Sequence, residues 1–100
     1  MLHEADHEFY DRAQEHLRIA NEQLDDVSRG QVSASMMYAC ARFNAWLSAS
    51  DRQSATDLKS AYGETIEYFV AQYRKMLVKN LDDFVTNFGE YRQPPADDRT

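Results

Sequence analysis

The chain has 100 residues, 43% of them apolar, and its 17 acidic against 11 basic residues give a net charge of −6. This size fits one globular domain with a single core, and an acidic chain without a separate basic cluster disfavours a nucleic-acid-binding surface. No apolar run approaches the roughly 18 residues of a membrane span and no secretory signal precedes the first helical pattern, so the sequence predicts a cytoplasmic protein.

The first predicted element is an amphipathic helix over about 5–25. Its apolar residues recur every three or four positions, as an apolar helix face requires: Phe9, Ala13, Leu17, Ala20 and Leu24. Acidic residues near its start, at 4, 6 and 8, suit the positive end of the helix dipole.

A second helix is predicted over 28–50. Ser28 and Gln31 fit a capping box, and Val27 and Val32 occupy the two positions of a hydrophobic staple. The short connection makes the first two helices antiparallel neighbours. Apolar residues extend around most of this helix, so we expect it to be the middle helix of three, with the single cysteine, Cys40, as a small core residue.

A third helix is predicted over 54–88, with Ser54 and Asp57 as its cap and Gly89 at its end. The resulting fold is all-α: a three-helix antiparallel bundle, a single domain over 1–89, and a loose tail over 90–100. The apolar positions of the third helix hold the helical period throughout: Leu58, Tyr62, Ile66, Phe69, Val70, Tyr73, Leu77, Leu81, Phe84 and Phe88.

The length of the third helix predicts association. At ~1.5 Å per residue the second helix spans roughly 33 Å and a continuous 54–88 helix roughly 52 Å. The overhang would expose apolar side chains that a second copy of the chain could cover, so we expect a homo-oligomer, with a dimer favoured. The predicted interface residues are Leu77, Leu81, Phe84, Val85 and Phe88. A break at Gly63 is the alternative, and it would leave a helix of about 25 residues that matches its partners.

Two blocks of the sequence carry a family resemblance. The segments VSASMMYACARFNAWLSAS and IEYFVAQYRKMLVKNLDDFVTNF resemble a family of small, all-helical bacterial proteins catalogued as a domain of unknown function. The similarity extends over roughly 9–88. It implies an all-α fold and a stand-alone cytoplasmic protein, and it implies no catalytic residue, cofactor or substrate.

The segment HEADH, residues 3–7, has the H-E-x-x-H spacing of zinc metallopeptidases. His3 and His7 would share one face of a helix, but a catalytic site also needs a third ligand and a cleft. We therefore predict solvated histidines, with a weak surface metal site of His3, His7 and Asp11 as the alternative. A di-iron bundle would need a second Glu-x-x-His motif, which the chain lacks.

Arg42 and Asn44 are the strongly polar side chains in the middle of the second helix. The simpler interpretation is that Arg42 forms a salt bridge within the chain or between subunits, because an unpaired buried charge is costly. The alternative is an anion-binding pocket in which Arg42 holds the ligand. The aromatic walls of that pocket would come from Tyr38, Trp46, Tyr68 or Tyr73.

Taken together, the residues predict a protein that binds rather than catalyses, with no cofactor. The first hypothesis is a protein-interaction or scaffold module that self-associates through the third helix and could have a further protein partner. The second is a protein that binds a small anionic ligand near Arg42, and the third is a metal or minor enzymatic role for His3 and His7. The basic residues Arg74, Lys75 and Lys79 are expected to pair within their helix with Asp82 and Asp83.

Overall fold

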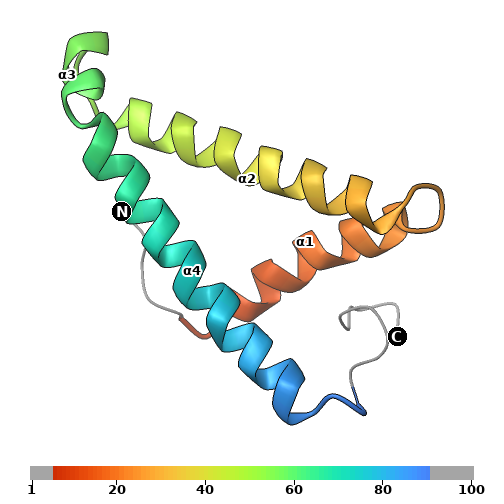
Figure 1. The fold of residues 1–100 in the computed structure, drawn as a ribbon. Coiled ribbons are helices and arrows are strands. Elements are labelled where there is room, and N and C mark those ends of the chain that lie inside the picture. Colours follow the sequence, from red (N-terminus) through yellow and green to blue (C-terminus); the bar gives the residue numbers. More distant parts are fainter. Residues whose placement is uncertain (1–5, 91–100) are drawn as a thin grey trace. The chain divides into compact units, whose positions relative to one another are not determined.

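A computed structural model describes residues 6–90, which contain four helices and no strand (Figure 1). The helices are α1 (Phe9–Gln23), α2 (Arg29–Ser50), α3 (Ala55–Ser60) and α4 (Tyr62–Thr86). The described residues divide into two compact units, 6–36 together with Glu90, and 37–89, and α2 runs through the boundary as one helix. The all-α prediction is confirmed, while the single domain over 1–89 stays a prediction.

The connection between α1 and α2 has the predicted capping box. The backbone N–H of Gln31 donates to Ser28 Oγ at 3.2 Å, and the backbone N–H of Ser28 donates to Gln31 Oε1 at 3.0 Å. These two bonds satisfy backbone donors that the first turn of a helix would otherwise leave without partners. Val32, the second staple residue, is among the buried residues at 4% exposure.

The predicted third helix is two helices, α3 and α4, with the break at Ala61. Ser60 Oγ donates to the carbonyl oxygen of Asp57 at 2.7 Å, in the place where a continuing α-helix would accept from the N–H of Ala61. That N–H instead donates to the carbonyl oxygen of Leu58 at 3.2 Å. At the end of α3 the Ser60 hydroxyl thus takes the place of a backbone donor, whereas the same kind of bond from Ser35 to Val32 leaves α2 continuous.

The break removes the predicted length mismatch. With 25 residues α4 spans about 37 Å, close to the roughly 33 Å of the 22-residue α2. The prediction of a continuous helix over 54–88 was therefore wrong. The alternative prediction put the break at Gly63, and the structure has it two residues earlier, at Ala61. A Cβ added to Gly63 would meet nothing within 4 Å, so no close approach requires a glycine there. The cap predicted for the start of this segment is present in α3, since the backbone N–H of Asp57 donates to Ser54 Oγ at 3.0 Å.

The buried apolar residues of the described chain are few and small: Ala20, Val32 and Ala61. None of the large side chains described is fully buried. Cys40, predicted as a core residue, is exposed. No helix within 6–90 is both long enough and apolar enough to cross a bilayer.

Candidate functional site

The apolar residues of α4 form one continuous surface, which we call the α4 stripe. At 100° per residue its members lie within about 40° of a line through Leu77, as an amphipathic helix face does. It consists of Ile66, Val70, Tyr73, Leu77, Leu81 and Phe84. The first five are 42–57% exposed and Phe84 is half-buried. Packing within residues 37–89, the unit that contains α4, therefore leaves much of this surface exposed.

The structure places the predicted interface residues in three different settings. Leu77, Leu81 and Phe84 lie in the α4 stripe. Val85 is 77% exposed and lies about 80° away from the centre of the stripe. Phe88 is 68% exposed in the turn that follows α4. The predicted set does not contain Ile66 and Val70 of the α4 stripe, which the helical period alone could have added, because it was taken from the overhang of a continuous 54–88 helix.

The side of α4 that its own chain covers is different from the stripe. Thr65, Tyr68, Phe69 and Gln72 are half-buried, and they lie roughly 80° to 180° from the centre of the stripe. Packing within residues 37–89 therefore uses one side of α4 and leaves its most apolar side exposed.

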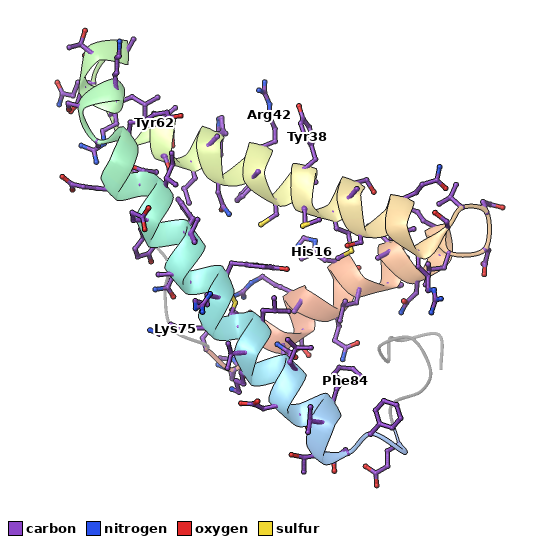
Figure 2. The ribbon with its side chains drawn as sticks, viewed as in Figure 1. His16, Tyr38, Arg42, Tyr62, Lys75 and Phe84 are labelled. Carbon is purple, nitrogen blue, oxygen red and sulfur yellow. The ribbon has the colours of Figure 1, made fainter. Side chains whose placement is uncertain are left out.

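The residues of the predicted anion pocket are brought together in part. Tyr38, Arg42 and Trp46 are spaced by four along α2 and project from one side of it, as Figure 2 shows for Tyr38 and Arg42. Tyr38 is 70% and Trp46 61% exposed. Trp46 contacts Phe43, with ring centroids 5.6 Å apart. Arg42 is exposed and forms no ion pair with any residue of the described chain.

Two further residues of the predicted anion pocket, Asn44 and Tyr73, lie elsewhere. Asn44 is half-buried and its amide donates to Cys40 Sγ at 3.4 Å, on the far side of α2 from Arg42. Tyr73 belongs to the α4 stripe and is 51% exposed. The α2 residues thus make an aromatic and cationic surface, and the pocket stays a prediction.

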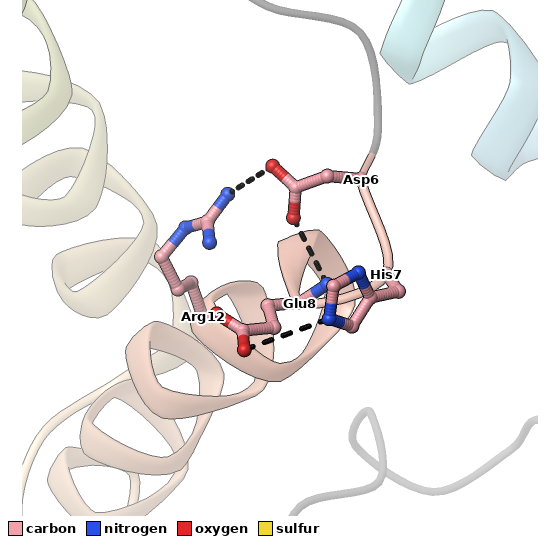
Figure 3. A network of polar contacts seen from close by, with 4 residues as sticks. All are labelled: Asp6, His7, Glu8 and Arg12. Carbon is pink, nitrogen blue, oxygen red and sulfur yellow. Dashed lines mark hydrogen bonds and ion pairs between the residues drawn. The ribbon is translucent and has the colours of Figure 1, made fainter.

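The candidate metal residues lie at the start of the described chain (Figure 3). His7 is in the turn that precedes α1, 92% exposed, with Nε2 3.7 Å from Glu8 Oε1. His3 lies outside the described residues. Asp11 is an exposed residue of the first turn of α1. No group of three or more His, Cys, Asp or Glu side chains in residues 6–90 could hold a metal ion.

Asp6 organises this N-terminal turn. Its Oδ1 accepts from the backbone N–H of Glu8 at 2.9 Å, and its Oδ2 accepts from the guanidinium of Arg12 at 3.1 Å (Figure 3). The hydrogen bond from Arg12, and next that from Glu8, holds the pKa of the Asp6 carboxyl below its ordinary value of 3.8. The network lies just before α1, which starts at Phe9, later than predicted, and whose N-cap residue Glu8 makes no side-chain cap hydrogen bond.

Comparison with known proteins places the chain in a family. A solved relative, the NMR structure of the protein NB7890A from Shewanella sp., is 34% identical, with a TM-score of 0.75 over 88% of this chain and 94% of the other. No curated protein matches the chain. The family model described as "Protein of unknown function (DUF3144)" matches residues 9–85. The chain therefore belongs to this family, as the two sequence blocks indicated.

Proposed function

We propose that the protein is a non-enzymatic interaction module that self-associates through the α4 stripe. The observation that supports this is the half-exposed state of six large side chains in one line along a single helix. Fully burying a side chain of this size is worth about 1.5–3 kcal/mol, so covering the exposed half contributes roughly 1 kcal/mol for each. Exposing a continuous apolar surface to water is unfavourable, and packing against the same stripe of a second copy would bury it.

The first helix of the same chain is shorter than the stripe. From Ile66 to Phe84 the stripe spans about 27 Å, whereas the 15 residues of α1 span about 22 Å. Ala20, in the last turns of α1, is already buried. Even if α1, α2 and α4 close into the antiparallel three-helix bundle that the sequence predicts, part of the stripe remains for a second copy.

Light scattering over a dilution series tests this proposal. Leu77→Glu/Leu81→Glu places two charges in the stripe, and Thr56→Glu/Thr86→Glu adds the same charge at exposed positions outside it, one in α3 and one on the opposite side of α4. We expect the wild type and the second variant to be dimers and the first to be a monomer. Because gross burial and the cost of association, about 4–15 kcal/mol, are similar in size, the dimer should dissociate on dilution.

Circular dichroism of the same samples separates dissociation from unfolding. If the Leu77→Glu/Leu81→Glu variant loses its helical signal, Leu77→Ala/Leu81→Ala takes its place and should weaken the dimer by about tenfold or more while it stays helical. A wild type that is monomeric at every concentration, or stripe variants that dimerise as well as the control, would refute the proposal.

A second candidate function is the binding of a small anion at the α2 surface. Arg42 has no ion-pair partner in the described chain, and Tyr38 and Trp46 stand one helical turn to either side of it. A guanidinium between two aromatic rings is suited to a planar anion such as a carboxylate. Chemical-shift changes on titration with benzoate, present in the wild type and absent in Arg42→Ala, are the expected result; equal changes in both would contradict it.

A further inference from the structure

Two opposite charges lie beside the α4 stripe on the same flank. Glu67 and Arg74 are about 80° and 60° from the centre of the stripe, in the same direction around the helix. Both are exposed, and neither forms an ion pair within residues 6–90.

Their own helix cannot pair them. An ion pair along a helix needs partners three or four residues apart, and Glu67 and Arg74 are seven apart. Arg74 has Val70, Ala71, Leu77 and Val78 at those spacings, and Glu67 has no basic residue there. The pairing expected for Arg74 with Asp82 or Asp83 is therefore out of reach, because those aspartates are eight and nine residues away.

A second copy of the stripe can pair both charges in one orientation. When two identical helices face each other antiparallel about a two-fold axis, the same flank of each helix meets its counterpart, so Glu67 faces Arg74 of the second copy. When they face each other parallel, each flank meets the opposite flank. That opposite flank carries no charge: Tyr62, Phe69, Met76 and Asn80.

The apolar residues fit the same orientation. With the two-fold axis beside Ala71, Ile66 lies opposite Leu77 of the second copy, and Val70 opposite its Tyr73. Glu67 and Arg74 of the second copy then stand at the same height along the helix to within two residues, about 3 Å.

We propose that two copies of α4 pack antiparallel about a two-fold axis beside Ala71, and that Glu67 and Arg74 form two symmetric ion pairs at the rim of this seam. The inference rests on the proposed self-association and adds its orientation, its register and the residues that specify them. The seam uses the side of α4 that packing within residues 37–89 leaves exposed. Charges at such a rim contribute mostly to orientation and register, since mismatched pairs repel.

Charge exchange tests the orientation. Glu67→Arg and Arg74→Glu each place like charges opposite one another twice in the dimer, and each should raise the dissociation constant about tenfold or more. Mixing the two variants restores both ion pairs in a heterodimer. The double variant Glu67→Arg/Arg74→Glu also restores them, with the net charge of the wild type, and should return to within about threefold of its dissociation constant.

Cysteine cross-linking gives an independent measure, in a Cys40→Ser background that removes the native thiol. A mixture of Ile66→Cys and Leu77→Cys chains should form a disulfide-linked heterodimer under mild oxidation, because only neighbouring residues reach disulfide distance. Leu77→Cys alone should form little, since the two copies of this residue lie at opposite ends of the seam.

The outcomes separate this inference from the proposed function. A wild-type dimer in which charge exchange brings no rescue, or in which Leu77→Cys alone cross-links readily, refutes the antiparallel register and leaves self-association standing. A wild type that is monomeric throughout refutes both, and the stripe is then covered within its own chain.

Discussion

Replacing Arg42 with alanine distinguishes the two interpretations of this residue. In the structure the Arg42 side chain is exposed and has no ion-pair partner in the described chain. Removing such a side chain should change the free energy of unfolding by no more than about 0.5 kcal/mol. Breaking a buried salt bridge, the simpler interpretation from sequence, would instead cost about 3–5 kcal/mol.

Urea unfolding followed by circular dichroism gives the measurement. For a domain of this size the free energy falls by about 1–3 kcal/mol per molar urea, so Arg42→Ala should shift the midpoint by less than about 0.5 M. All samples need one protein concentration, because association contributes to apparent stability. Arg18→Ala is the control, because Arg18 forms ion pairs with Glu15 at 3.1 Å and with Glu22 at 3.0 Å along α1. The urea midpoint of Arg18→Ala should therefore fall further than that of Arg42→Ala.

A midpoint lowered by more than about 1 M in Arg42→Ala would refute the assignment of Arg42 as a free surface cation. Repeating the experiment at several protein concentrations would then show whether the acidic residue that pairs with Arg42 belongs to the same chain or to a second copy. A loss that grows with concentration would indicate a partner on a second copy, and a constant loss would indicate one within the chain.

Two further predictions concern local structure. Ser28→Ala removes the acceptor for the N–H of Gln31 and should lower the free energy of unfolding by about 1 kcal/mol in the same urea assay, and an unchanged midpoint would contradict the capping box. The pKa of Asp6, measured by NMR titration, should lie below 3.8 in the wild type and return towards that value in Arg12→Ala. Because the folded pKa is the lower one, this network stabilises the fold above about pH 4 and the contribution is lost as the pH falls through the lowered pKa; equal pKa values in the two proteins would refute the role of Arg12.

The helix caps could be predicted from sequence because their partners are three residues apart. Ser28 with Gln31 and Ser54 with Asp57 each follow from helix geometry alone, and the structure contains the predicted serine cap in both cases. Contacts at this range depend on the backbone conformation of a single turn. No knowledge of the tertiary fold is needed to find them.

The break at Ala61 was harder to place because the competing energies are small. A glycine in a helix costs about 1 kcal/mol relative to alanine, which draws attention to Gly63. In the structure the helix ends where the Ser60 hydroxyl donates a hydrogen bond to the carbonyl oxygen of Asp57. The free energy of such a bond is of similar size to the cost of a glycine in a helix. Sequence identified the region, and the choice between neighbouring positions depended on which of two similar hydrogen bonds forms.

The candidate site was predictable as a pattern and not as a surface. The period of four and three along α4 identifies the stripe without any structure. Which side of the helix remains exposed depends on how the chain packs, and so the interface was assigned to the C-terminal end alone. The prediction that Cys40 is a core residue was wrong for the same reason. An apolar helix predicts that some of its residues are buried, but it does not say which ones the fold covers.

The small buried core links stability to association. The buried apolar residues of the described chain are alanines and one valine, while the large apolar side chains of α2 and α4 are half-buried or exposed. Ordering each residue costs about 1–2 kcal/mol of backbone entropy, and burial of large side chains is the main term that offsets it. A chain that buries so little alone should gain stability from its partner. We therefore expect the melting temperature of the wild type to rise with protein concentration and that of a monomeric stripe variant to be lower and independent of it. A melting temperature that stays constant over a hundredfold dilution of the wild type would show that the single chain covers its own apolar surface.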